Sequence, residues 1–153
     1  DLLDDCRAKK ASFELEQVVL DIIISTGIVS NLVSGKDYYY NSSVAHCVYN
    51  GSTVVENCKG KHLHGEIVSF GALTQLMYAG QIDQFDKIAA FNRSLGLPVC
   101  LSDLDITKED VPQIAERAKD TEEWRHRPKD VTTEKFMAAI IDADKRGKTY
   151  KKQ

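Results

Sequence analysis

The fold that we predict for this chain rests mainly on the stretches VAHCVYNGST at residues 44–53 and HGEIVSFGALTQLM at residues 64–77. Apolar side chains recur in both stretches at the three- and four-residue spacing of a helix. Asn41 or Ser42 would be a good N-cap for the first helix, and the polar segment Glu56–Lys61 between the stretches indicates a loop. Two helices that are joined by a short loop are usually antiparallel neighbours, so these stretches predict a helical hairpin.

Helical periodicity continues through most of the remaining sequence. Gly96 and Pro98 follow a fourth helix, and Thr107 and Asp110 have the spacing of a capping box before a fifth. We find no β-alternation of convincing length and no repeat at solenoid periods. The prediction is an all-α fold, an irregular antiparallel helical bundle that forms one domain over residues 1–153. The apolar positions expected to face its core are Leu15, Val18, Val19, Ile22, Ile23, Val44, Val48, Val55, Ile67, Val68, Leu73, Leu76, Met77, Phe85, Ile88, Ala89, Val111, Ile114, Ala115, Ala118, Phe136, Met137, Ile140 and Ile141.

Composition excludes several classes of function. The net charge of -3 gives no electrostatic reason to expect binding to nucleic acid or to an anionic membrane. No apolar run is expected to cross a bilayer, and the acidic start of the chain is unlike a targeting segment. Four cysteines lie at wide, irregular intervals, which indicates buried or free thiols in a reducing compartment. We therefore expect a cytoplasmic protein.

Two of the four histidines are candidate metal ligands. His46 lies on the helix predicted to start near Asn41 or Ser42 and to reach Val55. His64 begins the next helix, so the two rings could face each other across the hairpin. Two imidazoles and one carboxylate make a common catalytic metal set with one coordination position left open. The alternative is that each histidine is a hydrogen-bonded structural residue. His126 stands among basic residues and is expected to lie in a solvated loop.

The two stretches also resemble the metal-histidine motifs of glycerol dehydrogenases, within the iron- and zinc-containing alcohol dehydrogenases. Residues 44–53 are similar to a pattern close to A-H-A-x-x-N-G-x-T, and residues 62–71 contain a match to H-G-E-x-V-x-[FY]-G. The turn Leu95–Pro98 and the segment Asp142–Gly147 resemble further parts of the same family. The likeness extends over roughly residues 14–149 of the chain.

The resemblance implies a fold and a reaction. Family members have an N-terminal Rossmann-like nucleotide-binding domain and a C-terminal helical domain, with a divalent metal, usually Zn²⁺ or Fe²⁺, in the cleft between them. This chain would be the helical metal- and substrate-binding domain, without the nucleotide-binding one. His46 and His64 would be two of the three ligands. The reaction implied is NAD(P)-linked oxidation of an alcohol or polyol, in which the metal polarises the hydroxyl group.

Three departures from the family limit what the sequence predicts. It contains no glycine-rich phosphate-binding motif, and the motif that carries the family's aspartate ligand is not found, so we do not nominate Asp4, Asp5 or Asp21. The isolated chain is therefore expected to be inactive. The segment Lys36–Asn41 is longer and more aromatic than its family equivalent, so the sequence does not predict which alcohol is the substrate. Its tyrosines could instead pack at an interface, and a homo-oligomer is expected.

The sequence leaves open both the role of Glu66 and the class of function. Glu66 could orient a metal-binding histidine, but we favour the view that it is an acidic residue suited to the first turn of a helix. A lyase similar to dehydroquinate synthase is a second class, because that family also carries a metal histidine in an L-H-G-E context such as Leu63–Glu66. A third possibility is a catalytically inactive helical module.

Overall fold

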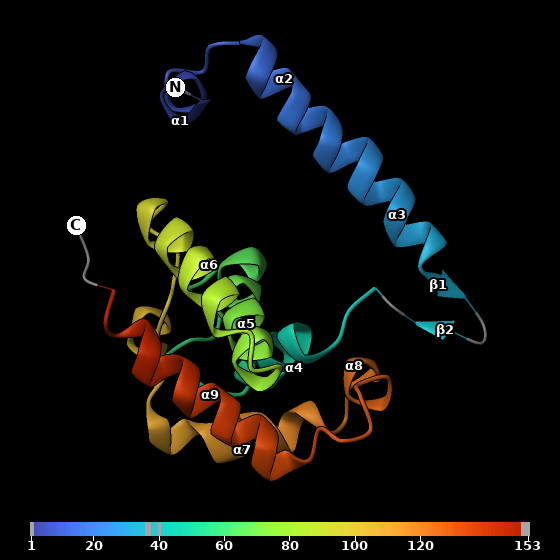
Figure 1. Ribbon diagram of the computed structural model, residues 1–153, viewed down its shortest axis with the longest axis vertical. Coiled ribbons are helices and arrows are strands. Elements are labelled where there is room, and N and C mark those ends of the chain that lie inside the picture. The colour runs from blue at the N-terminus through green and yellow to red at the C-terminus, as the bar shows by residue number, and fades with distance from the viewer. Residues whose placement is uncertain (1, 36–37, 40, 151–153) are drawn as a thin grey trace. The chain divides into compact units, whose positions relative to one another are not determined.

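The computed structural model describes residues 2–35, 38–39 and 41–150. The chain divides into two compact units, Asp1–Asn41 and Ser42–Gln153, whereas the sequence analysis treats it as one domain. Helices dominate both units, as predicted (Figure 1). The β-structure among the described residues is one antiparallel pair of two-residue strands, β1 (Ser34–Gly35) and β2 (Tyr38–Tyr39).

A long helix makes up most of the N-terminal unit. It follows the short helix α1 (Leu2–Arg7) and consists of α2 (Phe13–Leu20), a wider π-helical stretch (Asp21–Thr26) and α3 (Gly27–Leu32). The backbone stays helical at both junctions, with φ −63° and ψ −40° at Leu20 and φ −66° and ψ −44° at Thr26. The Ser12 side chain caps the start by accepting a hydrogen bond from the Leu15 amide. Gly27 therefore lies inside the helix and does not end it.

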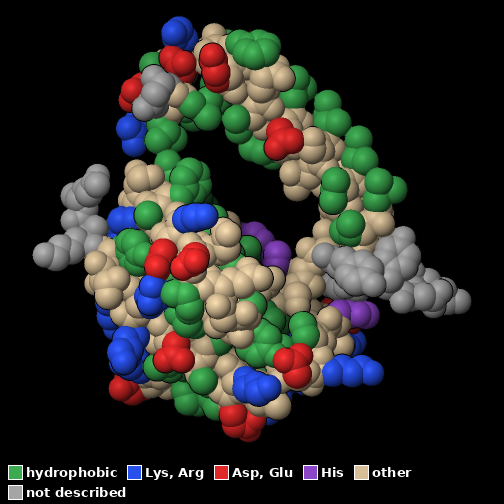
Figure 2. All heavy atoms as spheres, in the orientation of Figure 1, with side chains coloured by type: hydrophobic (Ala, Val, Ile, Leu, Met, Phe, Trp, Pro, Cys, Tyr) green, Lys and Arg blue, Asp and Glu red, His purple; other side chains and the backbone are tan. Residues whose placement is uncertain are grey.

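The apolar face of this helix is not buried, contrary to the sequence prediction. No residue from Phe13 to Leu32 is buried, and Ile22 and Ile23 are 61% and 66% exposed. Hydrophobic side chains run along the whole helix in Figure 2. The same 20 residues are long enough and apolar enough to cross a membrane by these two measures alone, which corrects the expectation that no such segment exists. Because a core helix or a signal sequence passes the same test, the finding is a weak indication.

The C-terminal unit is an irregular antiparallel bundle, as predicted. Two short 3₁₀ turns, Leu101–Leu104 and Lys108–Asp110, interrupt it between α6 and α7. Its helices are α4 (Val44–Ser52), α5 (His64–Tyr78), α6 (Ile82–Ser94), α7 (Val111–Ala118), α8 (Glu122–Arg125) and α9 (Thr133–Gly147).

Local sequence signals account for most of these boundaries. Gly80 and Gly96 have φ values of 67° and 75°, in the left-handed region that favours glycine, and they end α5 and α6. The Thr107 amide donates to the Asp110 carboxylate at 2.8 Å, and the Thr107 side chain accepts from the Asp110 amide, as the predicted capping box requires. Thr132 caps α9 by accepting from the Lys135 amide.

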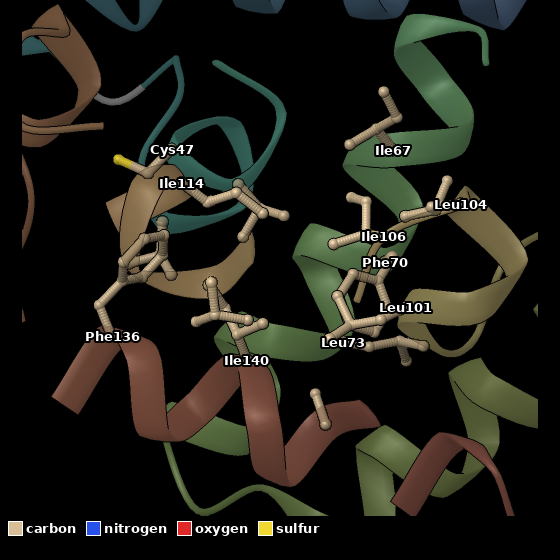
Figure 3. Packing of buried hydrophobic residues seen from close by; sticks show 14 of the residues in the cluster. Cys47, Ile67, Phe70, Leu73, Leu101, Leu104, Ile106, Ile114, Phe136 and Ile140 are labelled. Carbon is tan, nitrogen blue, oxygen red and sulfur yellow. The ribbon is translucent and has the colours of Figure 1, made fainter. Parts of the chain in front are cut away.

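One hydrophobic core holds the bundle together. Its largest fully buried side chains include Phe70 of α5, Phe85 of α6 and Phe136 of α9. The four apolar residues predicted for α7 are all buried. Figure 3 shows α9 directing Phe136 and Ile140 towards α7 and α4. One face of α4 therefore packs against this core, and the polar side chains of the helix must lie on its other faces. The labelled members of the cluster are Cys47, Ile67, Phe70, Leu73, Leu101, Leu104, Ile106, Ile114, Phe136 and Ile140.

Candidate metal centre

Close packing of α4 against α5 determines where the two candidate ligands lie. Gly71 of α5 sits against Ala45 of α4, and a Cβ atom at Gly71 would lie 2.9 Å from the Ala45 Cα atom. Further along, the ring of Tyr49 on α4 contacts the ring of His64 on α5. Residue numbers rise along α4 as they fall along α5, so the helices are antiparallel, as the hairpin prediction requires. The glycine that ends the stretch HGEIVSFG thus allows the helices to approach.

The structure brings His46 and His64 together. Their ring centroids are 5.3 Å apart, with an angle of 47° between the ring planes. The Tyr49 ring meets the His64 ring edge-on, with centroids 4.2 Å apart and an interplanar angle of 68°. His46 is half-buried, whereas His64 is exposed at the first residue of α5. Of the two rings, that of His46 is therefore the more enclosed and that of His64 the more accessible to solvent.

Electrostatics favours the neutral form of His46. Burial lowers the pKa of its imidazole below the ordinary 6.5, and the neighbouring His64 lowers it further. The negative charge of Glu123 acts in the opposite direction and raises it. A neutral imidazole keeps a nitrogen lone pair free for a metal ion or a hydrogen-bond donor. Imidazole nitrogens of this kind could bind a borderline-soft divalent cation such as Zn²⁺.

Glu123 is a component of this neighbourhood that the sequence analysis missed. It lies on the four-residue helix α8, in a segment where only a basic loop was expected. One carboxylate oxygen accepts a hydrogen bond from Ser42 Oγ at 3.2 Å, and the other accepts one from Asn50 Nδ2 at 3.0 Å. The available signal was Thr121, a good N-cap residue that is followed by two glutamates suited to the first turn of a helix.

The other two histidines are paired elsewhere. His62 Nε2 lies 3.2 Å from an oxygen of Asp105, and its Nδ1 lies 3.9 Å from Glu66. His126 is an exposed turn residue directly after α8, as expected for a solvated loop, and its Nε2 lies 2.8 Å from an oxygen of Glu122. Glu66 accepts a hydrogen bond from the Leu63 amide at 2.7 Å and so caps α5, as favoured from the sequence.

A third metal ligand is not found beside the two histidines among the described residues. Within the described ranges, no group of three or more histidine, cysteine, aspartate or glutamate side chains is arranged to hold a metal ion. Asp4, Asp5 and Asp21 belong to the N-terminal unit. The aromatic segment Lys36–Asn41 was expected to influence the substrate. Within it, residues 36, 37 and 40 and the side chains of Tyr38 and Tyr39 lie outside what the structure describes.

Comparisons with known proteins identify relatives over this region. The chain is 34% identical to a glycerol dehydrogenase of Escherichia coli over 150 residues, which is 93% of this chain and 40% of the relative. It is 36% identical to a glycolaldehyde reductase of Halobacterium salinarum, over 69% of this chain and 30% of that protein. No protein-family model matches the chain.

A solved structure agrees with these sequence relatives. The fold is similar to that of a probable glycerol dehydrogenase from Sinorhizobium meliloti, with a TM-score of 0.65 and 31% sequence identity, covering 71% of this chain and 32% of that one. The chain thus spans about 40% or less of the length of these relatives. It is a homologue of the glycerol dehydrogenases, consistent with the C-terminal part of that family.

Proposed function

We propose that this chain forms the metal- and substrate-binding part of a metal-dependent, NAD(P)-linked dehydrogenase that acts on an alcohol or polyol. His46 and His64 are two of the metal ligands in this proposal. The observation that carries it is the convergence of these rings, 5.3 Å apart, in a chain whose relatives are named glycerol dehydrogenases and a glycolaldehyde reductase. The motifs quoted for the resemblance contain both histidines.

The residues of this chain have distinct parts in the proposed site. His46, whose pKa is lowered by burial and by His64, presents a neutral nitrogen from the half-buried side. His64 presents its ring from the exposed side, where a substrate hydroxyl could enter, and the Tyr49 ring holds it edge-on. A divalent cation bound there would stabilise the alkoxide form of the substrate, and NAD(P) would accept the hydride.

In this proposal, the other residues of the active centre do not belong to this pair of histidines. A third protein ligand, which would be the family's aspartate, and the nucleotide-binding residues would come from other parts of the full-length protein. Zn²⁺ and Fe²⁺ both suit nitrogen and oxygen donors, so we propose either as the resident ion. We further propose a cytoplasmic location and a homo-oligomer, as expected from the sequence, and the isolated chain is proposed to be inactive.

Alcohol oxidation by the full-length protein tests this function. Reduction of NAD⁺ and NADP⁺ would be followed with glycerol, other polyols and simple alcohols, before and after removal of metal with a chelator. We expect turnover that is lost on chelation and restored by Zn²⁺ or Fe²⁺. His46→Ala and His64→Ala should each lower it by on the order of a hundredfold or more, because several kcal/mol of charge stabilisation is lost.

His126→Ala provides the matched control, since His126 is paired with Glu122 at the end of α8. This variant should retain wild-type turnover. Metal-dependent oxidation that persists in both His46→Ala and His64→Ala would contradict the proposal. Phosphate release from a heptulosonate phosphate, without alcohol oxidation, would instead support the lyase alternative.

A further inference from the structure

Glu123 connects α8 to two points on the segment that carries His46: Ser42, just before α4, and Asn50, within α4. Its two carboxylate oxygens accept hydrogen bonds from Ser42 Oγ, just before α4, and from Asn50 Nδ2, in the second half of that helix. The two partners are 81 and 73 residues away in the sequence. Both bonds go to an ionised acceptor that is partly buried, and such bonds are stronger than those between neutral groups.

The short helix that carries Glu123 is itself firmly anchored. Trp124 is buried, and its ring meets that of Phe136 of α9 edge-on, with centroids 5.4 Å apart. The Arg127 guanidinium lies 4.1 Å from the centre of the Trp124 ring and donates a hydrogen bond to the Trp124 carbonyl. Thr121 caps the helix by accepting from the Trp124 amide. Glu123 therefore extends from a support that the hydrophobic core holds in place.

The bridge acts on the face of α4 that carries His46. Asn50 is four residues after His46, so their side chains lie on the same face, one helical turn apart. Across the helix hairpin, His64 has its own support in the ring of Tyr49. Tyr49 also belongs to α4, so the position of this helix affects the surroundings of both histidines.

We propose that Glu123 is a positioning residue, which holds α4 through Ser42 and Asn50 so that the His46 ring faces His64. As a statement about a metal centre, this rests on the proposed function. The effect comes from the hydrogen bonds, so an acceptor that preserves them should suffice. The side-chain amide that Glu123→Gln introduces can still accept from one partner and, if the Asn50 amide turns over, donate to Asn50 Oδ1. Glu123→Ala removes the bridge altogether.

Two measurements on the 153-residue chain test the proposal. The first is the affinity for Zn²⁺, measured by calorimetry. The second is the nuclear Overhauser contact between the His46 and His64 ring protons in the metal-free protein. We expect Glu123→Ala to weaken Zn²⁺ binding about tenfold, the lower end of the range for outer partners of metal ligands, and to weaken the ring contact. Glu123→Gln should restore most of both. Glu122→Ala, on the exposed side of α8, should match the wild type.

The outcomes separate this inference from the proposed function. Wild-type Zn²⁺ affinity and ring contact in Glu123→Ala would overturn the inference. So would a Glu123→Gln variant as impaired as Glu123→Ala, because the negative charge rather than the hydrogen bonds would then matter. If the 153-residue wild type binds no Zn²⁺, the two histidines alone do not hold the ion, and the proposed function is then decided by the assay of the full-length protein. The ring contact in the metal-free variants then decides the positioning role, and unfolding curves show that each variant is folded.

Discussion

Gly71 lies directly against Ala45, where α5 crosses α4, and this approach leaves no room for a side chain. A Cβ atom at Gly71 would lie 2.9 Å from both the Cα atom and the carbonyl carbon of Ala45, and closer still to its carbonyl oxygen. These neighbours are backbone atoms, so they cannot move aside without shifting the helix. The contact is next to His46 in the sequence and thus sets the separation between the two helices that carry His46 and His64.

Gly71→Ala should separate α4 from α5. We expect a loss of about 1–3 kcal/mol in the free energy of unfolding, the usual cost of overpacking, measured by urea denaturation. Gly65→Ala is the control, because it lies in the same helix with nothing within 4 Å of a Cβ atom. Gly65→Ala should leave the free energy of unfolding unchanged or raise it by up to about 1 kcal/mol. Equal stability in both variants would show that the close approach is not a constraint.

Cys47 should be inert as a thiol in the native protein. Burial, assisted by the negative charge of Glu123, raises the pKa of Cys47 to about 12, and burial also raises the pKa of Cys58. Since the thiolate is the reactive form, almost none of it exists at about pH 8. In a disulfide-exchange assay, the exposed Cys6 should react at once and the other three cysteines only after unfolding. A rapid reaction that remains in Cys6→Ser would contradict this.

The sequence predicted the helical hairpin well because the signals that define it are local. The periodicity of α5, its closing Gly80 and the capping carboxylate of Glu66 all act within a few residues of one another. The facing of His46 and His64 followed from antiparallel packing alone. Glu123 could not be predicted in this way. Its partners are more than 70 residues away, and its four-residue helix is too short to produce a periodic pattern.

Asp86 should contribute to stability in a pH-dependent way. The guanidinium of Arg146 donates to both carboxylate oxygens, at 2.7 and 2.6 Å, and Tyr150 donates a third hydrogen bond. Arg146 first, and then Tyr150, lowers the pKa of Asp86 from 3.8 to about 2. Because the pKa is lower in the folded protein, the stabilisation is present above pH 3.8 and is lost as the pH falls towards 2.

Asp86→Asn should therefore flatten the decline in melting temperature between about pH 4 and pH 2, and lower the melting temperature at neutral pH. Asp83→Asn, on the same helix, serves as the control and should follow the wild-type curve. A wild-type slope that persists in Asp86→Asn would show that other carboxylates cause the acid sensitivity.

Asp144 is a buried carboxylate that joins α9 to the turn after α6. It is 0% exposed, and it accepts hydrogen bonds from the Leu101 amide at 3.0 Å and from Lys148 Nζ at 2.7 Å. Asp144→Ala leaves the Leu101 amide without its acceptor. We expect it to lower the free energy of unfolding by about 3 kcal/mol or more. Asp142→Ala, on the exposed side of the same helix, should change it by less than about 0.5 kcal/mol. Similar losses in the two variants would contradict this structural role.

The N-terminal helix was predicted from its apolar spacing, but the burial of its apolar side was not predicted correctly. Leu15, Val18 and Val19 have helical spacing, and the helix is present, but the spacing does not say what covers the apolar side. In the structure none of the helix is buried, and Ile22 and Ile23 stay exposed. Periodicity predicts a secondary structure from neighbouring residues, whereas burial depends on partners that the local sequence does not contain.

Zinc titration of single and double histidine variants tests the metal centre most directly. If His46 and His64 bind one ion, the wild type should take up one Zn²⁺ per chain. His46→Ala, His64→Ala and the double variant should then lose similar amounts of affinity, because removing either ligand disables the shared site. His62→Ala, which is paired with Asp105, should bind as the wild type does. Losses that simply add in the double variant, or Zn²⁺ binding that none of the three variants alters, would contradict a shared ion.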